Sequence, residues 1–150
     1  RWPARLSATT GSGAMADRSR VLVAGRAAGE VLRLDEPLSF WGGMDPVTGC
    51  ITDLRHPQVG QSVTGRVLVM PFGRGSSGGS SVIAEGIRAG TAPSAILLLE
   101  PDEIVTLGAI VADELYGESM PVVVLAEDLH SLLRTGQQVT VAPDGSVVGM

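Results

Sequence analysis

From residue 67 onward, short uninterrupted apolar runs alternate with segments of helical periodicity. The apolar runs cover residues 67–70, 95–99 and 122–125. In the segments that follow them, apolar residues recur at helical spacing, which predicts helices over 80–88, 104–115 and 126–134. Continuously apolar strands are typical of a parallel sheet that is covered on both faces. The alternation therefore predicts an α/β fold.

Further β structure is predicted on both sides of this alternating part. The expected strands cover residues 20–24 and 30–34 before it, and 138–142 and 146–148 after it. Between the predicted strands 30–34 and 67–70 lies a long irregular stretch, residues 40–62, with Pro46, Pro57 and four glycines. A stretch of this length without regular structure is usually functional or disordered.

A few polar residues have a predicted local role. Asp45 begins the sequence Asp-Pro-Val-Thr-Gly, which predicts a turn in which its carboxylate accepts a backbone N–H. His56 has no neighbouring metal ligands, and Cys50 is expected to fill apolar space. His130 stands among acidic residues and a serine, which predicts that it lies on a solvated helix face.

Composition excludes several classes of protein. The hydrophobic content is 44% and the mean hydropathy is +0.27, so the chain is not a disordered one. A net charge of −5 without interleaved basic and aromatic residues argues against a nucleic-acid partner. No apolar run approaches the roughly eighteen residues that a membrane-spanning helix needs.

The single cysteine, Cys50, bears on the cell compartment, and the first nineteen residues bear on the domain boundary. A single cysteine cannot form an internal disulfide or a cysteine cluster, and a free thiol suits the reducing cytoplasm. Residues 1–19 are expected to be a disordered leader or an expression remnant, and residues 20–150 to form one domain.

The strongest candidate for chemistry is the glycine- and serine-rich segment 71–81, which reads Pro-Phe-Gly-Arg-Gly-Ser-Ser-Gly-Gly-Ser-Ser. A strand is predicted before it and a helix after it. The amide N–H groups and the positive dipole at the start of such a helix attract anions, and glycines let the backbone approach a ligand closely. Ser80 is expected to cap this helix.

Two nucleotide-binding interpretations of this segment are open. Gly73-x-x-x-x-Gly78 has the spacing of a phosphate loop, but Gly79 stands where the lysine belongs, and the chain contains no lysine. Gly73-x-Gly75-x-x-Gly78 also matches the dinucleotide fingerprint, with Glu100 after the next apolar run as the ribose-binding acid.

A third interpretation comes from resemblance. Gly75-Ser76-Ser77 before a helix resembles the Gly-Ser-Ser loop of the aconitase swivelling domain. The wider frame resembles the small subunit of aconitase X over about residues 21–141, with matching motifs at 38–49, 56–57, 60–62, 65–69 and 73–77. The resemblance implies a swivelling β/β/α domain.

The resemblance also implies an activity, that of a subunit of a lyase which dehydrates a hydroxy acid. Ser76 then becomes the base that removes the proton next to the substrate carboxylate. Ser77, Arg74 and Gly75 become substrate contacts. Trp41 is interpreted either as a plug at the edge of the core or, with Gly42, as a mobile flap on the substrate side.

One departure from aconitase concerns the residue after the two serines, which is Gly78 here instead of arginine. This departure argues against citrate and isocitrate as substrates, and the resemblance instead implies those of aconitase X members, cis-3-hydroxy-L-proline or mevalonate 5-phosphate. The arginine-only, alanine-rich composition is typical of a GC-rich bacterial gene and favours the first. The iron or iron–sulfur centre is expected on a large catalytic subunit, and the chain is expected to bind no cofactor alone.

Overall fold

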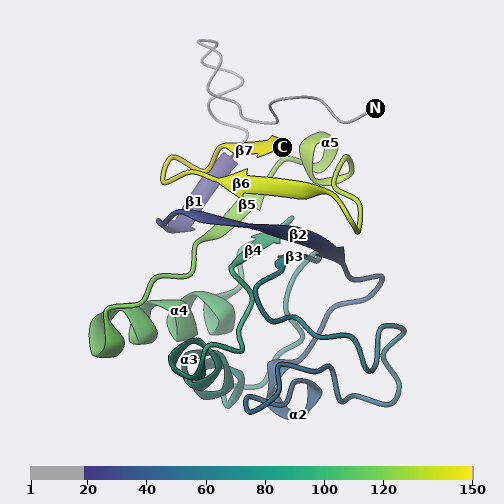
Figure 1. The fold of residues 1–150 in the computed structure, drawn as a ribbon, viewed down its shortest axis with the longest axis vertical. Coiled ribbons are helices and arrows are strands. Elements are labelled where there is room, and N and C mark those ends of the chain that lie inside the picture. The colour runs from purple at the N-terminus through teal and green to yellow at the C-terminus, as the bar shows by residue number, and fades with distance from the viewer. Residues whose placement is uncertain (1–18, 150) are drawn as a thin grey trace.

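The computed structural model describes residues 19–149 (Figure 1). Its core is a seven-stranded sheet in the order β1–β5–β4–β3–β2–β6–β7. The strands are β1 (Ser19–Val23), β2 (Ala27–Arg33), β3 (Val67–Val69), β4 (Ala95–Leu98), β5 (Val122–Leu125), β6 (Gln138–Val141) and β7 (Val147–Gly149). Strands β2 to β5 are mutually parallel, whereas β1, β6 and β7 pair antiparallel with their neighbours.

Alternate side chains of the central strands enter two different cores. Leu68 and Ile96 face α3 (Gly79–Ala89) and α4 (Glu103–Tyr116), which lie side by side on the outer face of the sheet (Figure 1). Val67 and Leu97 face inward, toward apolar residues of β6 and β7. Both faces of these strands are therefore buried, as their continuously apolar sequences predict.

The sheet curls until its two ends meet. A Cβ atom on Gly145, in the turn between β6 and β7, would lie 2.9 Å from Val21 Cγ2 of β1 and 3.4 Å from Val123 Cγ1 of β5. The curled sheet thus contributes two β layers, and α3 and α4 contribute the third layer. The predicted α/β class and the β/β/α arrangement are confirmed by this topology.

The third predicted helix is shorter than its sequence suggests. Helix α5 (Glu127–His130) ends four residues before the predicted boundary at Arg134. The chain turns there because Leu133, which is completely buried, packs into the inner core. His130 is also buried, so the prediction that it lies on a solvated face is wrong.

The buried His130 joins three segments of the chain. Its Nε2 lies 3.1 Å from the carbonyl oxygen of Met70, at the end of β3, so this nitrogen carries the hydrogen and donates it. Arg33 Nη2 lies 3.5 Å from Nδ1, and Arg33 Nη1 donates to the carbonyls of His130 and Leu133. Burial lowers the pKa of His130, and the nearby positive charge of Arg33 acts in the same direction.

This lowered pKa predicts a loss of stability in mild acid. The unfolded chain binds a proton at His130 more readily than the folded one, so protonation favours unfolding as the pH falls below about 6.5. We expect the free energy of unfolding to decrease by up to about 1.4 kcal/mol per pH unit in that range. Urea unfolding at pH 7.5 and at pH 5.5 measures this decrease in the free energy of unfolding. His130→Gln should be less stable at pH 7.5 but lose less on acidification; parallel losses would exclude His130 as the cause.

The stretch 40–62 is irregular, as predicted, but it is tied down. It begins with the turn α2 (Phe40–Gly43), and isolated bridges pair Met44 with Ile51 and Cys50 with Ser62. Asp45 Oδ1 accepts the N–H of Val47 at 2.8 Å, which confirms the predicted turn. None of the described helices is long and apolar enough to cross a membrane.

His56 has a structural role within this stretch. It is buried, its Nε2 lies 3.0 Å from the carbonyl of Glu36, and its Nδ1 accepts the N–H of Gln58 at 3.0 Å. Both ring nitrogens are therefore occupied by backbone groups.

Candidate active site

The serine loop, defined as residues 71–78, connects the carboxyl end of β3 to the first turn of α3 (Figure 1). Two of its backbone N–H groups donate hydrogen bonds near its start. The N–H of Gly73 donates to Asp102 Oδ2 at 2.9 Å, and the N–H of Arg74 donates to the carbonyl of Leu38 at 3.1 Å. Carboxyl ends of parallel strands are where open α/β sheets bind ligands.

The tip of the loop presents unused donors. Within residues 19–149, the amide N–H groups of Gly75, Ser76, Ser77 and Gly78 have no hydrogen-bond partner, and neither hydroxyl group of the two serines has one. Ser76 is half-buried and Ser77 is exposed. A Cβ atom on Gly75 would meet only Ile104 Cδ1, at 3.8 Å. The tip thus forms an open cluster of donors at the positive end of α3.

Ser80 does not cap α3, which corrects the prediction. The helix begins at Gly79 and its N-cap residue is Gly78, without a side-chain hydrogen bond. The Ser80 hydroxyl instead donates to the carbonyl of Ile104 in α4 at 2.8 Å. It therefore ties the two outer helices together beside the loop.

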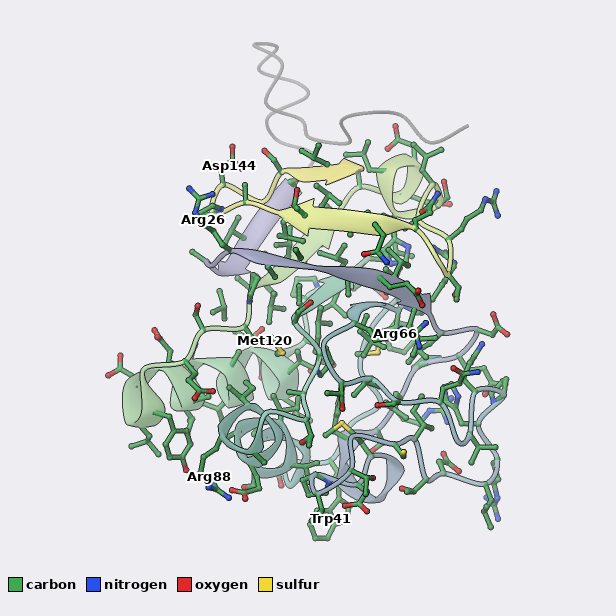
Figure 2. The ribbon with its side chains drawn as sticks, viewed as in Figure 1. Arg26, Trp41, Arg66, Arg88, Met120 and Asp144 are labelled. Carbon is green, nitrogen blue, oxygen red and sulfur yellow. The ribbon has the colours of Figure 1, made fainter. Side chains whose placement is uncertain are left out.

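Trp41 lies against the serine loop, although it is distant in the sequence. A Cβ atom on Gly78 would lie 2.8 Å from Cε3 of the indole, which is 62% exposed, and Figure 2 shows the ring projecting at the edge of the fold. Trp41 (φ −71°, ψ 112°) and Gly42 (φ 75°, ψ −8°) have the dihedral angles of a type II turn, which needs glycine at the second position. This exposure contradicts the interpretation of Trp41 as a core plug.

Arg74 points toward an acidic partner. Its Nη2 lies 3.7 Å from Glu36 Oε1, and both side chains are about half exposed. Such an ion pair is weak in water and can be exchanged for a ligand at little cost. The guanidinium therefore remains available near the loop.

The described residues do not fit an iron–sulfur cluster. No group of three or more His, Cys, Asp or Glu side chains among them could hold a metal ion. Cys50 is the only cysteine of the chain, whereas such clusters are commonly held by four thiolates.

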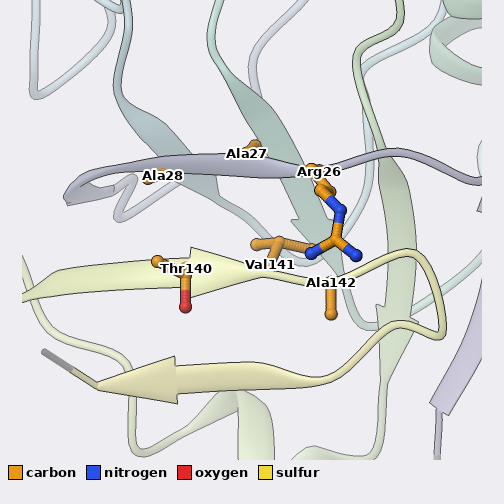
Figure 3. A pocket seen from close by; sticks show the side chains of 6 residues that line it. All are labelled: Arg26, Ala27, Ala28, Thr140, Val141 and Ala142. Carbon is orange, nitrogen blue, oxygen red and sulfur yellow. The ribbon is translucent and has the colours of Figure 1, made fainter.

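Among the hollows that the described residues form, one reaches the tip of the serine loop and another lies over the sheet. A groove of about 550 Å³ runs between α3 and α4 and is lined by Ser77, Ser80, Ser81, Ala84, Glu85, Leu107, Val111 and Tyr116. A second hollow, of about 400 Å³, lies over β2 and β6, where Figure 3 shows the Arg26 guanidinium beside Val141 and Ala142. Only the first is continuous with the serine loop.

A family model described as the aconitase X swivel domain matches residues 16–150. The chain belongs to the aconitase X swivel-domain family. The match includes the whole serine loop and confirms the resemblance seen in the sequence. The relatives of this family include dehydratases.

Relatives of this aconitase X swivel domain fall into two groups. The cis-3-hydroxy-L-proline dehydratase of Pseudomonas aeruginosa is 54% identical over 113 residues, which are 75% of this chain and 20% of that protein. The phosphomevalonate dehydratase small subunit of Methanothermobacter thermautotrophicus is 43% identical over 126 residues, which are 83% of this chain and 92% of that protein. The chain thus spans about a fifth of the first relative and most of the second.

The fold of the swivel domain matches a solved structure. The crystal structure of Thermococcus kodakaraensis aconitase X in its holo form superposes with a TM-score of 0.78 at 41% identity. The superposition covers 89% of this chain and 96% of that one.

The family match favours the swivel-domain interpretation over dinucleotide binding. The local geometry agrees, because the carboxylate of Asp102 occupies the space beside Gly73 and its negative charge opposes a pyrophosphate. The N–H of Glu100 donates to the carbonyl of Pro71 at 3.0 Å, so the backbone there is part of the loop's support.

Sequence reasoning missed the role of Asp102. The only sequence signal for it is its place two residues before the predicted helix 104–115, which is typical of a helix cap.

Proposed function

We propose that the chain is the swivelling subunit or domain of an aconitase X dehydratase that acts on cis-3-hydroxy-L-proline, with Ser76 as the base. The observation that carries this proposal is the open cluster of N–H and hydroxyl donors at the tip of the serine loop, in a domain of the aconitase X swivel family. Mevalonate 5-phosphate is the competing substrate.

The proposed reaction removes water across two neighbouring carbon atoms. Ser76, as its alkoxide, takes the proton from the carbon that bears the carboxylate, and hydroxide leaves the next carbon, so that a double bond forms between them. A serine alkoxide is unfavourable in water, and nearby donors must stabilise it. The unpaired N–H groups of the loop and the positive end of α3 act in that direction.

The other residues of the loop are assigned to substrate binding. Ser77 and Arg74 donate hydrogen bonds to the substrate carboxylate, since charge-assisted donors hold anions well. Gly75 lets the backbone approach the substrate, because no side chain stands there. Trp41, on the turn formed with Gly42, covers the bound substrate from its position against Gly78.

Two observations support hydroxyproline over the phosphorylated substrate. The hydroxyproline dehydratase of Pseudomonas aeruginosa is 54% identical to this chain, whereas the phosphomevalonate dehydratase small subunits of Methanothermobacter thermautotrophicus and Thermococcus onnurineus are 43% and 40% identical. The serine loop also carries only one cation, Arg74, whereas a phosphate dianion favours several.

The catalytic partner is proposed to be a large aconitase X subunit or domain that holds an iron or iron–sulfur centre. This chain's own residues do not fit such a centre. Exposed apolar side chains on α4, among them Leu107 at 53% and Leu115 at 67% exposure, support contact with a partner. The assembly is proposed to be cytoplasmic.

Co-expression tests the proposal. The chain is purified alone and together with the large aconitase X subunit of the same genome, and each sample is assayed with cis-3-hydroxy-L-proline and with mevalonate 5-phosphate. We expect turnover of the first substrate by the assembled enzyme and none by the chain alone. If the assembly turns over only mevalonate 5-phosphate, that compound replaces cis-3-hydroxy-L-proline as the assigned substrate. Activity of the isolated chain would refute the need for a partner.

Trp41 provides a spectroscopic prediction for the same assembly. In a Trp2→Phe variant, Trp41 is the only tryptophan, and its exposed indole should be readily quenched by acrylamide in the lone chain. Quenching should fall at least about twofold when the large subunit binds, because a partner surface covers the serine loop. Unchanged quenching in the active assembly would show that Trp41 does not face the partner.

A further inference from the structure

The start of α4 contacts both the beginning of the serine loop and the first residues of α3 that follow the loop. Asp102, the N-cap residue of α4, accepts the N–H of Val105 through Oδ1 at 2.9 Å. Its other oxygen, Oδ2, accepts the N–H of Gly73 at 2.9 Å. One carboxylate therefore links the start of a helix to the start of the loop.

Gly73 is shaped for this contact. A Cβ atom there would lie 2.5 Å from Oδ2 and 2.9 Å from Cγ of Asp102, closer than side-chain atoms can approach. The absence of a side chain lets the carboxylate reach the backbone N–H. The contact with Asp102 is therefore enough to require glycine at position 73, and no ligand contact is needed to account for it.

Ile104 supports the far end of the loop. A Cβ atom on Gly79 would lie 3.0 Å from Ile104 Cγ2, and the carbonyl of Ile104 accepts the Ser80 hydroxyl at 2.8 Å. The N–H and hydroxyl groups of the loop tip between these two anchors donate no hydrogen bond among the described residues, and the carbonyls of Ser76 and Gly78 accept N–H groups of α3, those of Gly79 at 2.9 Å and Val82 at 3.3 Å. The position of the tip thus depends on the anchors.

We propose that Asp102 is a positioning residue that holds Ser76 in place through Gly73, three positions earlier in the chain. The proposal rests on the function proposed above. Both carboxylate oxygens of Asp102 already accept backbone N–H groups, so the role assigned to it is to hold the loop and not to bind substrate. A carboxylate suits this task because hydrogen bonds to a charged acceptor are short and strong, and because two oxygens can hold two N–H groups at a fixed separation. A shift of about 1 Å at a catalytic group can cost about 100-fold in rate.

Two substitutions separate this role from helix capping. Asp102→Asn preserves shape and an N-cap oxygen, but its amide group offers only one acceptor oxygen, so Val105 and Gly73 cannot both be satisfied. Asp102→Ser also caps α4, but its short side chain cannot span to Gly73. Asp144→Asn is the matched control, because Asp144 Oδ1 likewise accepts a backbone N–H, that of Ser146 at 2.9 Å. Figure 2 places Asp144 and Trp41 at opposite ends of the fold.

The test combines kinetics of the assembled enzyme with amide hydrogen exchange of the full chain. For both Asp102 variants we expect kcat to fall about 10–100-fold, with a melting temperature close to that of Asp144→Asn. The Gly73 amide should exchange at least about tenfold faster, while the amides in the middle of α4 keep their protection.

The proposal is overturned by a kcat within twofold of the wild type in both variants, or by unchanged exchange at Gly73. A loss of kcat that Asp144→Asn shares would assign the effect to general destabilisation and also overturn it. If the wild-type assembly dehydrates neither substrate, the proposed function fails, and the exchange of Gly73 alone decides whether Asp102 holds the loop.

Discussion

Replacement of Ser76 with alanine is expected to lower kcat of the assembled dehydratase by about 10²–10⁴-fold, which is the usual contribution of general-base catalysis. KM should stay within about twofold, because a base acts in the transition state and contributes little to ground-state binding. Stability should be nearly unchanged, since the Ser76 hydroxyl has no partner among the described residues. Steady-state kinetics and thermal melting measure these quantities on the same preparation.

Two further serine variants serve as comparisons. Ser77→Ala should raise KM more than it lowers kcat, since Ser77 is assigned to substrate binding. Ser81→Ala is the control, because Ser81 is exposed in the first turn of α3 and its hydroxyl has no hydrogen-bond partner within residues 19–149. A kcat of Ser76→Ala close to that of Ser81→Ala would refute the assignment of the base and leave the loop as an anion-binding turn.

The sequence predicted the layered part of the fold well for a physical reason. Residues 67–70 and 95–99 lie in strands that are buried on both faces, so burial itself imposes a continuous apolar run that is easy to recognise. Helices α3 and α4 also end within a residue of their predicted boundaries, because Gly90 and Gly117 adopt the left-handed conformation that terminates a helix locally.

Errors arose where contacts between distant segments override local pattern. His130 has polar neighbours in sequence, yet Arg33 and the carbonyl of Met70 satisfy it in the interior. The contact between Trp41 and Gly78 and the hydrogen bond from Gly73 to Asp102 are similar cases, since each joins segments that no local periodicity connects. The catalytic roles of the loop residues stay predictions until the variants are measured.

A second large effect is expected at Gly108, where α4 crosses α3 most closely. A Cβ atom there would lie 2.8 Å from the carbonyl oxygen of Ser80 and 2.9 Å from Ile83 Cβ, and the first of these belongs to the backbone and cannot rotate away. Gly108→Ala should therefore push the helices apart and lower the free energy of unfolding by about 1–3 kcal/mol, the usual cost of overpacking.

Gly86→Ala is the matched comparison, because Gly86 also lies inside a buried helix face. A Cβ atom on Gly86 would lie 3.2 Å from Met44 Cε, the end of a flexible side chain that can move. Alanine is favoured over glycine inside a helix by about 1 kcal/mol, so this variant should be neutral or slightly more stable. Urea unfolding of both variants tests the difference. Only Gly108→Ala should also lower kcat, because the Ser80 carbonyl that it displaces lies in the first turn of α3, directly after the loop that carries Ser76. Equal stability of the two variants would show that α3 and α4 can separate without strain, and the position of Ser76 would then not depend on their close contact.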